Sequence, residues 1–418
     1  MTRMKVFKFG GASVKDAAGV RNLAHILRTQ AQQGAIVVVS AMGKTTNALE
    51  EVTRAYADHK TDEALTRWAT VQSYHEAIMR DLAGADWAQT FRGAYGTFLW
   101  VDTVLRQKPS GPFDQIYDQI VSVGEIISTQ IVAAYCGAIW ADARQLVCTD
   151  DTFREGKVDW EQTQRAIRGF VNGCGDGSLI VTQGFVGQAA GTGLTTTLGR
   201  EGSDYTAAIF AYCTDAESVT IWKDVPGVLN ADPKYFDQTV LLTQLTYQDA
   251  IELAYYGATV IHPKTIKPLQ NKGIPLYVRS FLQPEAPGTV INASEGQLTT
   301  PSFIFKVNQT LISLHPKDFS FIAEDNLSQI FGQFAAAGIK INLMQNTAIS
   351  FSVVVDTNPD RLPALLDLLR QNFRVSYNEG LELITIRYYD QATIDRVLVD
   401  KKLLLEQKSR YTVQLVVK

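Results

Sequence analysis

The sequence predicts an α/β protein with a mostly parallel central sheet that helices cover on both faces. Two observations predict this fold class. Strands rich in Val and Ile alternate with helical stretches, and the strands are apolar along almost their whole length. The predicted strands of the sheet are residues 6–9, 36–39, 138–141, 179–182, 219–222 and 275–278.

The composition indicates a globular protein. A chain of 418 residues has room for two or three domains, and 46% hydrophobic with 20% charged residues excludes disorder. A net charge of −4 without a dense Lys/Arg block argues against nucleic acid as the main partner. No apolar run reaches the length of a membrane span, and the N-terminus enters a strand at once. We therefore expect a cytoplasmic protein with no membrane partner.

The cysteines and histidines suggest neither a disulfide framework nor a metal site. Four cysteines lie far apart without a C-x-x-C pair, so we expect reduced, mostly buried thiols. Five scattered histidines show no metal-ligand spacing, and we predict no protein-bound metal.

Residues 47 to about 108 differ from the alternating pattern. They are helix-patterned, rich in Ala, Glu, Arg and Trp, and interrupted near Gly84. This predicts a helical insertion after the second strand, with Trp68, Trp87 and Trp100 in its core.

The stretch 184–208, GFVGQAAGTGLTTTLGREGSDYTAA, predicts an anion site. We expect a strand before it, a long Gly/Thr loop, and a helix over 204–213 with Ser203 as its N-cap. The glycines allow close backbone approach, the helix start favours an anion, and Arg200 can grip a carboxylate or phosphate. The alternative is a Gly-rich connector with a salt-bridged Arg.

A second anion signal opens the chain. Lys8 ends a short strand, Gly10 and Gly11 follow it, and a helix is predicted from about residue 13 to 32. This order is typical of a strand–loop–helix phosphate cradle. The alternative is an ordinary terminal strand with one exposed Lys.

Residues 284–301 hold three prolines and two glycines, which marks a domain boundary. Beyond it, residues 310–377 read βαββαβ, a ferredoxin-like module. A second unit begins at 381 and stops one helix and one strand short. Residues 303–308 can supply the missing strand by returning to that unit.

Six motifs carry a resemblance to a known family. KFGGASV, VVVSAMGKTTN, SVGE, GLTTTLGREGSDYTAA, KDVPGVLNADP and YGATVIHP fall in the order and spacing of aspartate kinases, members of the amino acid kinase family. The resemblance is close over residues 3 to about 293 and looser beyond. It implies a three-layer αβα amino acid kinase domain over 1–293. It also implies two ACT modules, which bind amino acids, over 303–418, the second of them shortened.

The resemblance implies a reaction between ATP, as MgATP, and L-aspartate that gives 4-phospho-L-aspartate, the entry step to lysine, threonine and methionine. Aspartate's side chain is already ionised at neutral pH, so such a kinase needs no general base. It needs cations and dipoles that offset the repulsion between two anions. The alternatives are a kinase for glutamate or a nucleotide, and a catalytically weak amino-acid sensor. We also expect a homodimer or higher homo-oligomer.

The resemblance also implies roles for individual residues. Lys8, oriented by Asp204, would hold the transferring phosphoryl group, Arg200 the substrate α-carboxylate, and Glu125 the α-ammonium. The implied substrate-binding residues are Ser40, Thr46, Glu125, Arg200, Gly202 and Ser203. The implied nucleotide-binding residues are Lys8, Gly10, Gly11, Lys223, Asp224, Lys234, Thr259 and Lys264.

Three positions depart from the family pattern. Leu229 stands where many members carry Tyr, and Glu201 replaces a frequent Gly. Thr259 stands where many carry a phosphate-binding Lys, for which Lys264 can compensate; the alternative is a solvated surface Lys.

The C-terminal region resembles modules that bind an inhibitory amino acid. The residues implied for an effector are Asn342, Gln345, Asn346 and Thr347. Asn342 stands where lysine-inhibited relatives often carry Asp, and neutral amides suit threonine's hydroxyl somewhat better. Lysine remains possible through another carboxylate. An unresponsive module or an unregulated dimerisation tail is the alternative.

Overall fold

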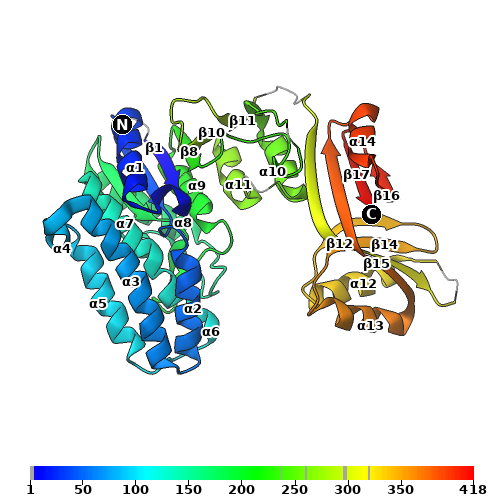
Figure 1. The fold of residues 1–418 in the computed structure, drawn as a ribbon, viewed down its shortest axis with the longest axis horizontal. Coiled ribbons are helices and arrows are strands. Elements are labelled where there is room, and N and C mark those ends of the chain that lie inside the picture. Colours follow the sequence, from blue (N-terminus) through cyan, green and yellow to red (C-terminus); the bar gives the residue numbers. More distant parts are fainter. Residues whose placement is uncertain (1–3, 237, 259–260, 295–298, 319–320) are drawn as a thin grey trace. The chain divides into compact units, whose positions relative to one another are not determined.

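The computed structural model describes residues 4–418 except 237, 259–260, 295–298 and 319–320 (Figure 1). The chain forms two compact units. Unit 1 consists of Met1–Val228, Leu241–Ile251 and Thr259–Gly296. Unit 2 consists of Leu229–Val240, Glu252–Ala258 and Gln297–Lys418. Two segments N-terminal to the predicted boundary at 284–301 therefore belong to unit 2.

Unit 1 is built on an eight-stranded sheet with the order β3-β5-β2-β1-β8-β10-β11-β9. Its parallel strands are β3 (Ile139–Ala141), β5 (Leu179–Gln183), β2 (Ala35–Val39), β1 (Lys5–Phe9), β8 (Ser218–Lys223) and β10 (Leu276–Ser280). These are the six strands that the sequence predicts, so the mostly parallel sheet is confirmed. At one edge, β11 (Thr289–Asn292) runs antiparallel to β10, and β9 (Gln244–Thr246) runs parallel to β11.

Helices cover both faces of this sheet, which confirms the three-layer architecture. On one face, α9 (Gly202–Thr214) packs on β1, β2 and β8, with α8 (Trp160–Cys174) and α11 (Pro263–Lys272) beside it. On the other face, α7 (Val123–Cys136) packs on β2, β3 and β5, and α1 (Ala17–Gln30) contacts α7. All five residues of β2 are buried, as its continuous apolar sequence requires.

The insertion after β2 is helical, as predicted. It contains α2 (Thr45–Ala57), α3 (Thr61–Ala83), η2 (Gly84–Asp86), α4 (Trp87–Thr90) and α5 (Arg92–Leu105). The long helices α3 and α5 lie side by side (Figure 1). Trp68 is buried in their core, but Trp100 is 48% exposed, so the core prediction was wrong for Trp100. All four cysteines are free. Only Cys213 is fully buried, whereas the sequence predicted that most of the four thiols are buried.

The prediction that no apolar run reaches the length of a membrane span was wrong for one segment. The segment Phe113–Cys136 contains α6 (Phe113–Val121) and α7. Judged by length and composition alone, it is long and apolar enough to cross a membrane. However, 72% of its most apolar window is buried inside the protein. Packing in the core of unit 1 therefore accounts for its composition.

Two local predictions in unit 1 were wrong. The stretch after β5 is not only a loop, because β6 (Val186–Ala189) and β7 (Thr195–Thr197) form an antiparallel pair within it. With β4 (Cys148–Thr149) they make a separate sheet, in which the β-branched run of β7 is buried. Near the N-terminus, α1 begins at Ala17 and not near 13, because Asp16 accepts a hydrogen bond from the Gly19 amide and caps the helix. A short 3₁₀ turn, η1 (Gly11–Val14), precedes it.

Unit 2 contains a six-stranded antiparallel sheet with the order β13-β14-β12-β15-β17-β16. Two strands of 15 residues each, β12 (Ser302–Pro316) and β15 (Phe373–Arg387), pair along their length. The first half of β12 pairs with the second half of β15, from Ser302 opposite Arg387 onward. Residues 303–308 thus supply the strand that the second module lacks, as predicted. The two modules share one continuous sheet.

The remaining elements of unit 2 complete two adjoining cores. Helices α12 (Glu324–Ala336) and α13 (Leu362–Asn372) pack with β12 and β14 (Phe351–Asp356). Helix α14 (Gln391–Leu398) packs with β15 and β17 (Thr412–Val417). The edge strands are β13 (Ile341–Asn346) and β16 (Leu403–Lys408).

Candidate active site

A cavity of about 700 Å³ lies in unit 1 at the carboxyl ends of the parallel strands. Lys8 of β1, Ser40 after β2, Glu125 of α7 and the segment 199–204 all line it. The two anion signals, far apart in the sequence, therefore meet in one place. The topology brings them together because β1 is central in the sheet and α9 packs directly on it.

A buried ion pair forms the floor of this site. The Lys8 Nζ lies 2.6 Å from Asp204 Oδ1, and the Lys223 Nζ lies 3.5 Å from Asp204 Oδ2. Burial alone would raise the pKa of the Asp204 carboxyl, but Lys8 and Lys223 outweigh it and hold that pKa below its usual value. Asp204 therefore stays ionised and fixes both ammonium groups, as predicted for Lys8.

Glu125 is a buried carboxyl group with one oxygen left over. Its Oε1 accepts a hydrogen bond from the Ala41 amide at 3.3 Å, whereas Oε2 has no hydrogen-bond partner within the described part of the chain. Burial raises the pKa of Glu125 to about 8, against the smaller effects of the amides of Ala41 and Glu125 itself. A buried, unpartnered oxygen on a cavity wall is suited to a cationic ligand group.

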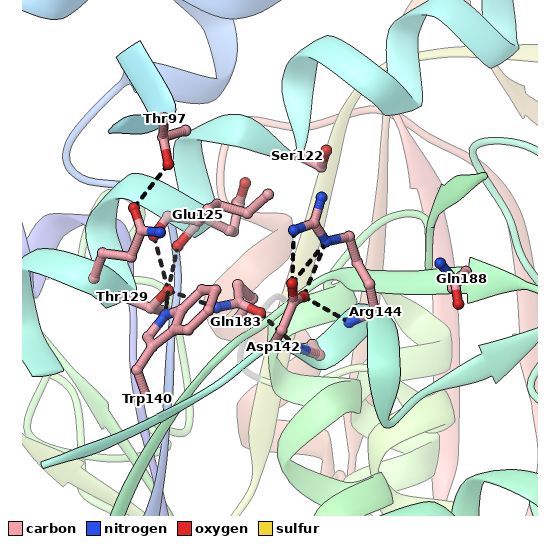
Figure 2. Close-up of polar contacts among 12 residues, drawn as sticks. Thr97, Ser122, Glu125, Thr129, Trp140, Asp142, Arg144, Gln183 and Gln188 are labelled. Carbon is pink, nitrogen blue, oxygen red and sulfur yellow. Dashed lines mark hydrogen bonds and ion pairs between the residues drawn. The ribbon is translucent and has the colours of Figure 1, made fainter. Parts of the chain in front are cut away.

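A polar network behind Glu125 fixes the helix that carries it (Figure 2). Thr129, one turn later on α7, donates from Oγ1 to the Glu125 carbonyl at 2.8 Å. The same oxygen accepts hydrogen bonds from Gln183 Nε2 at 2.7 Å and Trp140 Nε1 at 3.0 Å. Gln183 also accepts from the Ala143 amide at 2.6 Å. This network was not predicted from the sequence. Gln183, a polar residue at the end of a buried apolar strand, was the feature that could have indicated it.

The loop after β2 completes the wall next to Glu125. Ser40 and Thr46 both line the cavity, as predicted. The Ser40 carbonyl accepts a hydrogen bond from Ser128 Oγ at 2.7 Å, which ties the loop to α7. A Cβ atom on Gly124 would lie 3.0 Å from the Ala41 Cβ, so glycine there permits the close packing of α7 on this loop.

The segment before α9 supplies the opposite wall. Arg200 lines the cavity, is exposed, and forms no ion pair with any described residue, so its guanidinium is available to a ligand. Ser203 also lines it, but the prediction that Ser203 caps the helix was wrong. The chain enters α9 two residues earlier, through Glu201 in a left-handed conformation. Gly202 packs against Phe185, where a Cβ atom would lie 2.6 Å from a ring carbon.

Asp118 holds two other parts of the rim together and was missed in the sequence. Its carboxylate accepts hydrogen bonds from the Thr197 amide (2.9 Å), Thr197 Oγ1 (2.7 Å) and the Arg154 amide (2.8 Å). An acidic residue inside the apolar helix α6 was the available signal.

Several predicted nucleotide residues lie outside this cavity. Within the described residues, Gly10 and Gly11 do not line it, and a Cβ atom on Gly11 would lie 2.6 Å from the Ala41 carbonyl oxygen, which gives Gly11 a packing role. Asp224 is exposed just after β8, and Lys234 is exposed in unit 2.

The predicted compensation by Lys264 gains no support. Lys264 lies in the first turn of α11 and lines a different cavity, of about 340 Å³, with Trp160, Tyr205 and Tyr212. Thr259, the position it was expected to replace, lies outside the described residues.

The predicted effector residues lie on and just after β13 in unit 2. The Asn342 amide is fully engaged: Oδ1 accepts from Lys306 Nζ at 2.9 Å, and Nδ2 donates to Gln309 (2.8 Å) and Asp356 (3.0 Å). Gln345 and Asn346 are exposed, and Thr347 bonds to Ser350. The inference from Asn342 to threonine therefore loses its basis, because that side chain is not free.

Comparisons with known proteins agree with this geometry. The model of the Amino acid kinase family matches residues 3–280. The lysine-sensitive aspartokinase 3 of Escherichia coli (strain K12) is 31% identical over 92% of this chain and 87% of its own. The chloroplastic aspartokinase 1 of Arabidopsis thaliana is 30% identical over 84% of this chain, which spans 63% of that protein.

Solved structures show the same fold. The crystal structure of E. coli aspartokinase III in complex with aspartate and ADP has a TM-score of 0.80 at 27% identity, covering 99% of this chain and 96% of the other. The structure of Clostridium acetobutylicum aspartate kinase has a TM-score of 0.81 at 22% identity, with the same coverage. Together with the cavity built around Lys8, Asp204 and Glu125, these matches show that the chain belongs to the amino acid kinase family and, within it, to the aspartokinases.

Proposed function

We propose that this protein transfers the γ-phosphoryl group of ATP to the side-chain carboxylate of L-aspartate, giving 4-phospho-L-aspartate and ADP. One observation carries the choice of acceptor. Glu125, whose buried Oε2 has no hydrogen-bond partner among the described residues, lines the same cavity as Arg200, whose guanidinium forms no ion pair with those residues. A carboxylate and a guanidinium on one cavity suit the ammonium and α-carboxylate of a zwitterionic amino acid. Aspartate in the complex of the E. coli relative supports the same acceptor.

The reaction needs positioning and charge more than proton transfer. The acceptor carboxylate oxygen forms a bond to the γ-phosphorus while the bond from that phosphorus to the β,γ-bridging oxygen breaks, and ADP leaves with the electron pair. No proton moves because the acceptor is already ionised. Lys8, held by Asp204, offsets the charge of the transferring group, and Lys223 adds a second cation nearby.

The nucleotide enters as MgATP, so Mg²⁺ is part of the substrate. Two ammonium groups on one buried carboxylate fit a polyphosphate, because their combined charge exceeds that of Asp204. ADP in the complex of the E. coli relative supports nucleotide binding in this fold. Gly10, Gly11, Asp224, Lys234 and Thr259 remain predictions for the nucleotide side of the site.

The test is trapping of the acyl phosphate with hydroxylamine in the presence of MgATP. L-aspartate, L-glutamate and UMP serve as acceptors, with ADP release as a second readout. Hydroxamate formed with aspartate alone supports the proposal. Turnover with glutamate or UMP instead points to another kinase of this fold, and binding without turnover points to a sensor.

Regulation and assembly are a second part of the proposal. Unit 2 binds a free amino acid, and two or more chains associate through it in the cytoplasm. Lysine is the first candidate, because the E. coli relative is lysine-sensitive and one of its structures is a complex with lysine and aspartate. Exposed edge strands of the unit 2 sheet favour pairing between chains.

A further inference from the structure

Glu201 has an unusual backbone for its residue type. It precedes α9 with φ 58° and ψ 22°, in the left-handed region that favours glycine. Its carbonyl accepts the hydrogen bond from Tyr205 that starts the helix, while its side chain makes no capping bond. The helix start does not use the carboxyl group, and Glu201 lines the cavity together with Lys8 and Asp204.

The surroundings of Glu201 combine charges from three elements. Asp204 of the same helix and Lys8 of β1 line the cavity with Glu201, and the Nζ of Lys223 of β8 lies 3.5 Å from Asp204 Oδ2. The other ionisable groups on the cavity wall are Arg200, Glu125, Glu155, Arg154, Asp114 and Tyr117. With Glu201 ionised, its charge and that of Asp204 together balance those of Lys8 and Lys223. No net positive charge then remains in this cluster for a phosphate.

We propose that the carboxylate of Glu201 competes with the nucleotide phosphates for Lys8 and Lys223, so that nucleotide binding takes up one proton. This inference rests on the proposed function, because it requires MgATP to bind in this cavity. Protonation removes the competing charge and leaves the two ammonium groups to the phosphates. A glycine in place of Glu201 would supply no competing negative charge.

The direction of the pH effect follows from these charges. Burial, and then the negative charge of Asp204, raise the pKa of Glu201, while Lys223 and Lys8 oppose the rise. A bound phosphate adds another negative charge and raises this pKa further. Between the pKa values of the free and the bound state, affinity for the nucleotide therefore falls as pH rises, by at most tenfold per pH unit for one proton.

The experiment is isothermal titration calorimetry of the full chain with the Mg²⁺ complex of AMP-PNP, a non-hydrolysable ATP analogue, without aspartate. Measurements from pH 6 to 9 in two buffers of different ionisation enthalpy give both Kd and the number of protons taken up. The wild type should take up close to one proton within the window and lose affinity as pH rises. Glu201→Gln should take up about one proton fewer than the wild type, should lose less affinity as pH rises, and should bind about tenfold or more tightly at the alkaline end.

Two further variants keep the result interpretable. Glu201→Gly removes the carboxyl group together with the left-handed constraint, so it should match Glu201→Gln if the effect is electrostatic. Glu161→Gln, the same change in the exposed first turn of α8, should keep the wild-type proton uptake. The titration of the nucleotide itself is common to all variants and cancels in the comparison.

The outcomes separate this inference from the proposed function. Equal proton uptake and equal pH dependence in the wild type and both Glu201 variants would overturn the role of Glu201 while leaving the kinase assignment intact. Weaker binding by Glu201→Gln would also overturn it, because the carboxyl group would then assist the nucleotide. Absence of nucleotide binding by the wild type would overturn the proposed function, and this inference with it.

Discussion

Lys8 and Asp204 form a buried ion pair, with 2.6 Å between Nζ and Oδ1, although they belong to the first strand and to a helix near the middle of the chain. Their side chains are 9% and 2% exposed, so water screens the pair very little. Lys223 approaches the same carboxylate from β8. The site therefore holds its cations in place before a substrate arrives, which is the condition for electrostatic catalysis.

Lys8→Met should lower kcat by about 100- to 1000-fold, the usual effect of losing one group that stabilises developing charge. The KM for aspartate should change little, because Lys8 acts on the phosphoryl group. Steady-state kinetics with hydroxamate detection measures both constants. Thermal denaturation is the control: the double variant Lys8→Met/Asp204→Asn should be at least as stable as Lys8→Met, since it leaves no underpaired buried carboxylate. An unchanged kcat in a folded Lys8→Met protein would contradict the role.

Arg200→Ala should raise the KM for aspartate by about 10- to 100-fold with a much smaller effect on the KM for ATP, because it removes a charged hydrogen bond from ground-state binding. The measurement is the pair of KM values at saturating co-substrate. Arg144→Ala is the matched control, since Arg144 pairs with Asp142 and does not line the cavity. Equal effects on both substrates would refute the assignment of Arg200 to the α-carboxylate.

Aspartate binding should release a proton and tighten as pH rises toward 8. Glu125 has a pKa of about 8 in the empty site because it is buried, and a bound ammonium group favours its ionised form. The KM for aspartate should therefore fall with rising pH and level off above about 8. In Glu125→Gln this pH dependence should vanish and the KM should be raised throughout. A wild-type KM that is flat from pH 6 to 9 would argue against Glu125 as the ammonium partner.

His75 should make the protein sensitive to acid. It is buried among the helices of the insertion, Nδ1 lies 2.8 Å from the Val71 carbonyl oxygen, and burial lowers its pKa to about 4. As pH falls, the imidazole of His75 is therefore protonated in the unfolded chain before it is protonated in the folded protein. The stability that neutral His75 contributes is present above pH 6.5 and is lost as pH falls toward 4. The loss should amount to about 3 kcal/mol over this range.

The change in stability between pH 6.5 and 4, from urea denaturation, checks this prediction. His75→Leu should lose less stability over that range than the wild type. His25→Leu, the same substitution at an exposed position of α1, should behave like the wild type. If His75→Leu and the wild type lose equal stability, another group controls the acid sensitivity.

A true effector of unit 2 should both inhibit the kinase and stabilise the fold. At a hundred times its dissociation constant it should add roughly 2.7 kcal/mol to the free energy of unfolding. The measurement is activity and thermal stability with lysine, threonine and both at millimolar concentrations, with glycine as control. A response to lysine would fit the lysine-sensitive relative. No shift in either readout would leave unit 2 as an association element only.

The sequence by itself determined the strands of the parallel sheet and the two segments of the chain that form the anion site. Both signals are local: a buried parallel strand must be apolar on both faces, and close backbone approach to an anion requires glycine next to a cation. The return of residues 303–308 to the second module was also predictable, because a module that lacks one strand must take it from elsewhere in the chain.

The tertiary structure decided what each polar side chain can do. Among the described residues, Glu125 has one unpartnered oxygen because the loop after β2 supplies one amide and no second donor. Asn342 is lost to an effector because Lys306, Gln309 and Asp356 meet it in the folded sheet. Glu201 enters a helix through a conformation that its residue type does not predict. Charge, burial and hydrogen bonding at these positions depend on residues distant in the sequence, and packing alone brings those residues together.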